Sequence, residues 1–148
     1  MRRRPSTEGF TLIELILVIT ILGLLATIVA VNIMPRGAEA KRNAALVQIS
    51  YFKNGLQLFR FDNGFYPSTE QGLEALVQKP SVGRIPSKWP EGGYLESRMV
   101  PRDPWGSPYA YISPGLHGEP FDIISYGADG VEGGEGEDAD ITSWQVAE

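Results

Sequence analysis

In this 148-residue sequence, one isolated carboxylate and one cluster of carboxylates could do chemistry. Glu14 is the only charged residue in the apolar stretch 10–31. Residues 129–140 contain six acids, four glycines and no base. The first pattern requires an opposite charge from outside the stretch, because a carboxylate is costly in apolar surroundings. The second requires water or a cation, because like charges at this density repel one another.

The acidic segment 129–140 allows two interpretations. A charge run of this kind is ordinarily a solvated, disordered loop. Alternatively, its glycines let the backbone turn carbonyl oxygens inward and form a cage for Ca²⁺, which takes six to eight oxygen ligands. The spacing is not that of an EF-hand, since Val131 and Gly133 stand where that loop places oxygen-bearing side chains. Composition alone leaves both interpretations open.

Catalysis and nucleic-acid binding are both disfavoured. His117 is the only histidine, and the chain has no cysteine, no G-x-S-x-G elbow and no Walker lysine. We therefore expect His117 to be a loop residue that makes an ordinary hydrogen bond. The net charge is −5, and three of the thirteen basic residues are Arg2, Arg3 and Arg4. An acidic body without a basic stripe predicts no nucleic-acid partner, because phosphate contacts need clustered Lys and Arg.

The apolar stretch 10–31 is long enough to cross a bilayer as a helix, and the arginines before it should stay cytoplasmic. Glu14 then costs roughly 2–3 kcal/mol, so it needs a partner from another chain or from a terminal amine created by processing. Two alternatives stay open. The stretch could be a secretory signal cut near Ala30, although it exceeds the ~7–15 residues of a usual signal core. Glu14 could also extend to the lipid headgroups.

The motif around Glu14 resembles a known processing site. Residues 9–14, Gly-Phe-Thr-Leu-Ile-Glu, are similar to the site at which type IV prepilins and pseudopilins are cut. The resemblance implies that a membrane prepilin peptidase cuts after Gly9 and that Phe10 becomes N-methylphenylalanine. It also implies that Glu14 pairs with the Phe10 ammonium of a neighbouring subunit.

A long helix should carry this motif. One apolar face continues beyond the stretch with alternating spacings of four and three, at Ala45, Ile49, Phe52, Leu56 and Phe59. The helix is expected to reach about Asp62, with a kink where Pro35 and Gly37 interrupt it.

Shorter elements should follow the helix. Ser68 and Gln71 have capping-box spacing and predict a short helix over 69–78. The Pro- and Gly-rich segment 79–93 is expected to be an ordered loop with Trp89 packed into the core.

A small sheet should complete the body. Strand-like runs lie at Tyr109–Ile112 and Phe121–Ser125, joined as a hairpin, and a third is expected near Ile141–Val146. Asp103–Gly106 is interpreted as a turn. The predicted class is α+β and type IV pilin-like, with the long N-terminal helix packed on a small antiparallel sheet.

The C-terminal part, 114–144, resembles the corresponding region of the major pseudopilins of type II secretion systems. The resemblance rests on Pro114-Gly115, Asp122-Ile123, Ser125, Gly127-Ala128-Asp129-Gly130, Asp140-Ile141 and Trp144. It implies that calcium sits in the loop 126–141. Carried over by position, the ligands are the side chains of Asp129 and Asp140, the carbonyl oxygens of Tyr126 and Val131 and, as a weaker candidate, Asp138.

The resemblance also implies an organisation and a role. The expected parts are a leader peptide (1–9), a transmembrane half of the helix (10–31), its periplasmic half (32–62) and a globular body (63–148). A non-enzymatic subunit of this kind sits in the bacterial inner membrane and forms a homopolymer, the periplasmic pseudopilus. Its implied partners are minor pseudopilins, the peptidase, the inner-membrane assembly platform and inner-membrane lipid. The fibre helps drive folded exoproteins through the outer-membrane secretin.

Three alternative functions remain at this point. A type IV pilin for adhesion or motility would share the N-terminal segment, but it typically has a C-terminal disulfide loop, and this chain has no cysteine. A membrane-tethered hydrolase would need a nucleophile and a base. A secreted calcium-binding module would need an ordinary signal sequence.

Overall fold

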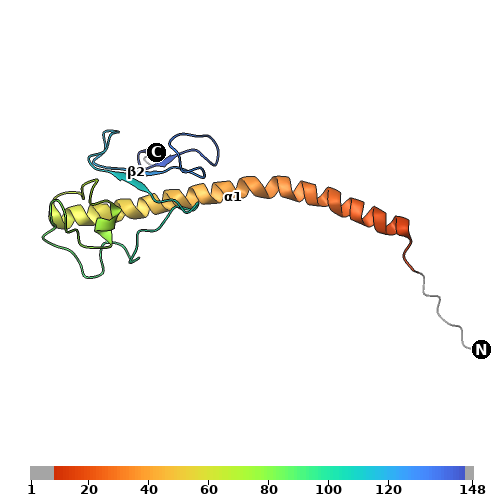
Figure 1. Ribbon diagram of the computed structural model, residues 1–148, viewed down its shortest axis with the longest axis horizontal. Helices are drawn as coiled ribbons and strands as arrows, with labels where there is room; N and C mark the ends of the chain where they lie inside the picture. Colours follow the sequence, from red (N-terminus) through yellow and green to blue (C-terminus); the bar gives the residue numbers. More distant parts are fainter. Residues whose placement is uncertain (1–8, 146–148) are drawn as a thin grey trace, which may run out of the picture. The chain divides into compact units, whose positions relative to one another are not determined.

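A computed structural model describes residues 9–145, with the side chains of residues 27–36 outside the description. The chain divides into two units, Met1–Gly37 and Ala38–Glu148. The element order is α1, the 3₁₀ helix η1, β1, β2 and β3 (Figure 1).

Helix α1 runs from Leu12 to Asn63. Thr11 caps its start, because the Thr11 hydroxyl accepts the Glu14 amide at 3.3 Å. Gly64 ends it in the left-handed conformation (φ 79°), with its amide bonded to the Arg60 carbonyl at 2.7 Å. The predicted end is thus confirmed to within one residue. The predicted kink and the predicted span 10–31 both involve residues whose side chains lie outside the description.

The described residues contain no helix that is both long enough and apolar enough to cross a membrane.

The core of the second unit forms between α1 and the sheet. The five predicted positions on the apolar face of α1 are all fully buried. They pack in one cluster with the inward side chains of the sheet, including Ile123 and Ile141. Phe52 meets Tyr109 edge to face, with ring centroids 5.1 Å apart. Burying one α1 stripe against a sheet follows directly from the 3.6-residue periodicity.

The sheet has three antiparallel strands in the order β1-β2-β3. β1 is Ala110–Ile112, β2 is Asp122–Ser125 and β3 is Ile141–Thr142. Tyr111 lies opposite Ile123 in the first pair. The predicted hairpin and third strand are confirmed, each shorter than expected.

The predicted helix over 69–78 is wrong in type. The capping box does form, since the Ser68 amide donates to Gln71 Oε1 at 3.1 Å and the Gln71 amide to Ser68 Oγ at 3.3 Å. Gly72 then takes φ 63°, and only the four-residue 3₁₀ helix Leu73–Leu76 follows. The Gln71 side chain instead holds the next loop, with Nε2 2.7 Å from the Val82 carbonyl.

The segment 79–93 is an ordered loop, as predicted. Trp89 is half-buried against the core, and its indole N–H donates to the Ala75 carbonyl at 3.0 Å. The predicted turn at Asp103 is also confirmed. The buried Asp103 carboxylate accepts the Ser107 amide at 2.7 Å and the Ser125 hydroxyl at 2.7 Å. Asp103 therefore ties the turn to β2.

Candidate functional site

The N-terminal end of α1 presents Glu14 in an apolar surface. Glu14 lies in the first helical turn, where a negative charge is favoured by the helix dipole. Its side chain is exposed and forms no ion pair within the described part of the chain. Phe10 is 85% exposed, and Leu12 and Ile13 are also exposed. Among the described residues, the carboxylate and its apolar neighbours are therefore left exposed.

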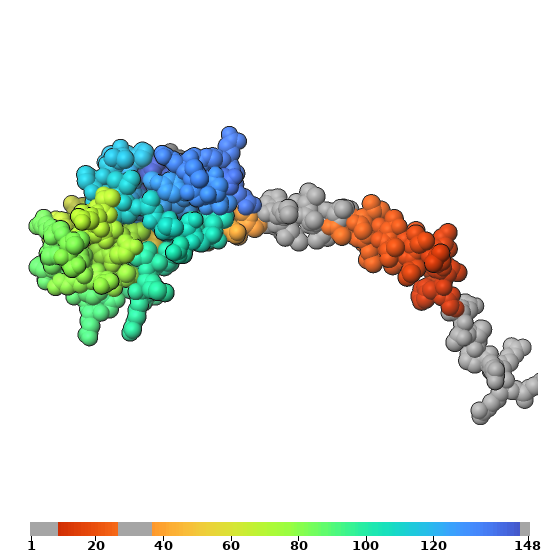
Figure 2. Space-filling view, in the orientation of Figure 1, coloured from red at the N-terminus to blue at the C-terminus, as the bar shows by residue number. Residues whose placement is uncertain are grey.

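Hydrogen bonds within the acidic loop hold its path; the loop belongs to the blue part of the chain in Figure 2. Asp140 Oδ2 accepts the Gly133 amide at 3.0 Å, so the carboxylate bridges seven residues of the loop. Asp129 Oδ1 accepts the Val131 amide at 3.1 Å. The Ala128 amide donates to the Glu137 carbonyl at 3.0 Å. In this structure the segment therefore follows an ordered, hydrogen-bonded path.

The predicted metal ligands differ in their exposure to solvent. Asp140 is half-buried, and its Oδ1 atom is buried without a hydrogen-bond partner. Asp129, Val131 and Asp138 are exposed and Tyr126 is half-buried. In the described residues no three His, Asp or Glu side chains converge on a point that could hold a metal ion.

A cation in this loop would therefore depend on carbonyl oxygens as well as carboxylates. The orphaned Asp140 Oδ1 atom fits such a site, because a buried carboxylate oxygen without a donor is costly unless a positive charge compensates it. Gly134 lets the loop close tightly, since a Cβ there would lie 2.5 Å from the Asp138 carbonyl oxygen. The donor set is all oxygen, which suits a hard cation such as Ca²⁺.

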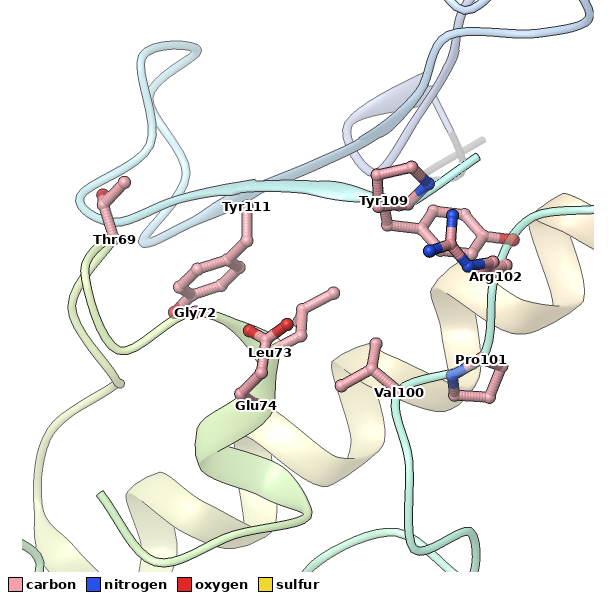
Figure 3. A pocket seen from close by; sticks show the side chains of 10 residues that line it. Thr69, Gly72, Leu73, Glu74, Val100, Pro101, Arg102, Tyr109 and Tyr111 are labelled. Carbon is pink, nitrogen blue, oxygen red and sulfur yellow. The ribbon is translucent and has the colours of Figure 1, made fainter. Parts of the chain in front are cut away.

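A cavity of about 310 Å³ lies beside β1 (Figure 3). Its walls include Glu74, Arg102 and Thr69. The Thr69 hydroxyl is occupied by the Ser113 backbone, to which it donates at 3.1 Å and from which it accepts at 2.8 Å. Burial raises the pKa of Tyr111, also in the wall, to about 12. The hydroxyl of Thr69 is thus engaged by the backbone of Ser113 and is not paired with a side-chain base.

Sequence reasoning missed a contact of His117. The expected hydrogen bond exists, but its partner is the fully buried Asp122 carboxylate, 2.8 Å from Nδ1, and the imidazole stacks on Trp144. The partners lie 5 and 27 positions away, so no local pattern in the sequence signals the cluster. Only the fold brings them together.

A long N-terminal helix with an acid in its first apolar turn, packed on a small antiparallel sheet, defines the type IV pilin class of fold. Comparison with family models adds two matches. Residues 4–30 match the prokaryotic N-terminal methylation motif. Residues 32–144 match the type II secretion system (T2SS) protein G family. The chain belongs to the type II secretion system protein G family.

Individual relatives agree with this assignment. The type II secretion system core protein G of Pseudomonas aeruginosa is 49% identical, covering 97% of this chain and 99% of its own. That of Vibrio cholerae is 43% identical, covering 99% and 97%. A crystal structure of the major pseudopilin from the type 2 secretion system of enterohaemorrhagic Escherichia coli superposes with a TM-score of 0.66 at 38% identity. It covers 77% of this chain and 95% of that one.

Proposed function

We propose that this protein is the repeating subunit of the pseudopilus of a type II secretion system, and that the growing fibre helps move folded proteins through the outer-membrane secretin. The observation that carries the proposal is the pairing of a protein G match over residues 32–144 with a methylation motif over 4–30. The rival reading as an adhesive or motility pilin is not favoured, because the relatives named above are secretion-system proteins. A structural family also gives no support to a hydrolase.

The proposal extends to processing and location. Cleavage after Gly9 would free the Phe10 amine, which becomes methylated, and the apolar stretch 10–31 would anchor the subunit in the inner membrane with its body in the periplasm. Glu14 would meet the Phe10 ammonium of the next subunit. The exposed carboxylate, without an ion pair in the described part of the chain, supports this pairing. Minor pseudopilins, the peptidase and the assembly platform complete the proposed set of partners.

Replacing Glu14 tests the assembly mechanism. Glu14→Ala should abolish fibres and secretion while leaving a processed monomer of normal stability, because it removes only the carboxylate that pairs with the neighbouring amine. Glu91→Ala, at an exposed acid in the body, is the matched control and should assemble normally. Normal fibre formation by Glu14→Ala refutes the pairing. Mass spectrometry should find N-methyl-Phe10 at the mature terminus, and a start near Val31 would instead indicate a secretory signal.

We further propose that Ca²⁺ binds in the loop 126–141. Asp129 and Asp140 would supply side-chain oxygens, Tyr126 and Val131 carbonyl oxygens, and Asp138 a further carboxylate. The ion would neutralise loop charge and hold the loop closed. The support is the orphaned Asp140 Oδ1 atom together with the all-oxygen donor set.

Chelation tests the calcium proposal. A ligand at 100 times its Kd stabilises a protein by about 2.7 kcal/mol, so removing calcium should lower Tm by several degrees. Asp140→Asn should lose this calcium response, whereas Glu132→Gln, at an exposed acid outside the proposed ligand set, should keep it. Coincident melting curves with calcium and with chelator remove calcium from the mechanism.

A further inference from the structure

Three residues from distant parts of the body form a cluster that the proposed function does not use. His117 lies in the β1–β2 connection, Asp122 begins β2, and Trp144 follows β3. His117 Nδ1 is 2.8 Å from Asp122 Oδ2. The imidazole and indole rings are stacked, with centroids 3.7 Å apart and planes 14° from parallel. We call these three residues the clasp.

The clasp is built around a buried carboxyl group. Asp122 is fully buried, and its Oδ2 atom also accepts the Leu116 amide at 2.7 Å, while Oδ1 has no partner in the described residues. His117 Nδ1 lies 2.8 Å from Oδ2, within hydrogen-bond distance of the same oxygen. Gly115 permits this arrangement, since a Cβ there would lie 2.8 Å from Asp122 Oδ1. The imidazole is therefore fixed in orientation and offers Trp144 a rigid surface.

Strand β3, next to the clasp, is too short to be stable through its own strand pairing alone. β3 contains only two residues, Ile141 and Thr142, and isolated pairing of that length is marginal. Ser143 extends the contact, because its amide donates to the Ile123 carbonyl at 2.9 Å and its hydroxyl accepts the Ile123 amide at 3.0 Å. Trp144 on His117 is the next contact along the chain. The two residues after β3 are thus held in succession, Ser143 by β2 and Trp144 by the β1–β2 connection.

The N-terminal end of β3 is connected to the acidic loop. Asp140 immediately precedes the strand and closes the acidic loop, whose six acids repel one another. Charge repulsion within the loop destabilises the pairing of β3 at its N-terminal end, whereas the clasp stabilises it at its C-terminal end. The position of Asp140 therefore depends on the register of a two-residue strand.

We propose that His117, Asp122 and Trp144 act as positioning residues: the clasp holds β3 in register and so keeps Asp140 where a Ca²⁺ ion in the acidic loop can use it. This inference rests on the calcium site proposed above. Clasp and ion are then thermodynamically coupled, so each stabilises the other by the same factor.

Calcium titration by calorimetry on the purified full chain in detergent tests the coupling. Trp144→Ala should weaken calcium binding by roughly tenfold, within the usual range for coupled sites. Trp144→Phe keeps a ring to stack on His117 and should stay within about twofold of the unaltered chain. Val77→Ala, which truncates a half-buried core side chain near η1, controls for general loss of stability. Unchanged affinity in Trp144→Ala overturns the proposal.

A second measurement separates failure of the clasp from failure of the calcium site. Without calcium, the amides of β3 and Ser143 should exchange with solvent faster in Trp144→Ala than in the unaltered chain, and Trp144→Phe should restore their protection. If the unaltered chain takes up no calcium, the calcium site fails and this exchange result alone decides on the clasp. Equal protection in Trp144→Ala and the unaltered chain overturns the clasp itself.

Discussion

Gly93 adopts a left-handed backbone conformation (φ 78°) directly beside η1. A Cβ there would lie 2.6 Å from the Leu76 carbonyl oxygen, which accepts the Tyr94 amide at 2.7 Å. Gly93→Ala should therefore combine backbone strain of about 1–3 kcal/mol with a clash of similar size. We expect the free energy of unfolding in urea to fall by about 2–4 kcal/mol.

The neighbouring glycine provides the control for Gly93. Gly92 has no positive φ, and nothing lies within 4 Å of the position its Cβ would take. Gly92→Ala should change stability by less than about 0.5 kcal/mol. Equal effects of the two substitutions would contradict the close approach of this loop to η1.

At the scale of elements, Tyr111 in β1 and Tyr109 immediately before this strand are buried, and their ionisation couples stability to pH. Burial raises the pKa of Tyr111 to about 12, and burial together with the Asp103 charge raises the pKa of Tyr109. Unfolded tyrosine ionises near pH 10. Between about pH 10 and 12 the unfolded chain loses protons that the folded chain keeps, so stability is complete below pH 10 and falls as pH rises.

Tyr109→Phe separates this ionisation from hydrogen bonding. The Tyr109 hydroxyl is buried without a partner in the described residues, whereas the Tyr111 hydroxyl donates to the Pro67 carbonyl at 2.9 Å. Tyr109→Phe should keep its stability at pH 8 and lose less of it above pH 10. Tyr111→Phe should also flatten the alkaline fall but cost about 1 kcal/mol at pH 8. Urea titrations across this range measure both, and a slope unchanged in Tyr109→Phe would contradict the assignment.

Local patterns predicted the elements whose contacts are local or periodic. The stripe from Ala45 to Phe59 specified the buried face of α1 because helical periodicity needs no tertiary information. The capping box at Ser68 formed as predicted, but the α-helix expected after it did not. Gly72 turns the chain, and the buried Gln71 side chain donates a hydrogen bond to the Val82 carbonyl in the following loop. Tertiary contacts overrode propensity there.

The candidate site was predictable to a similar degree. Composition indicated that the acidic loop needs a cation or water, and the motif at Gly9 indicated processing. Neither could reveal that Asp140 bridges back to Gly133 or that Trp144 stacks on His117. Such pairings join residues whose spacing follows no period, so they depend on the completed sheet.

Charge acts over the whole molecule. The net charge is −5 with His117 counted as neutral, and six of the acids lie together in residues 129–140. Raising ionic strength from about 0.01 M to 0.15 M shortens the Debye length from ~30 to ~8 Å. We expect this to raise the Tm of the calcium-free protein, because repulsion within the acidic loop is screened. The gain should shrink when calcium is present, and equal gains in both conditions would contradict a calcium ion in that loop.

The last consequence concerns how copies meet. Apolar side chains are exposed all around the first turns of α1, at Leu12, Ile13, Leu15, Ile16 and Leu17. A chain without cysteine allows single cysteines to be introduced cleanly. Cysteines placed one at a time at residues 15, 16 and 17 sample all sides of the helix, because successive residues point about 100° apart.

In cells that assemble the fibre, at least one of these cysteines should form a disulfide-linked dimer, since that bond requires Cα atoms within about 4.4–6.8 Å. Adding Glu14→Ala to the same variant should reduce the dimer strongly, because the proposed pairing of Glu14 with the Phe10 ammonium would set the register in which neighbouring helices approach. Quantifying dimer on non-reducing gels measures the difference. An equal yield of dimer with and without Glu14→Ala would mean that the helices associate through their apolar surface alone, without the proposed ion pair.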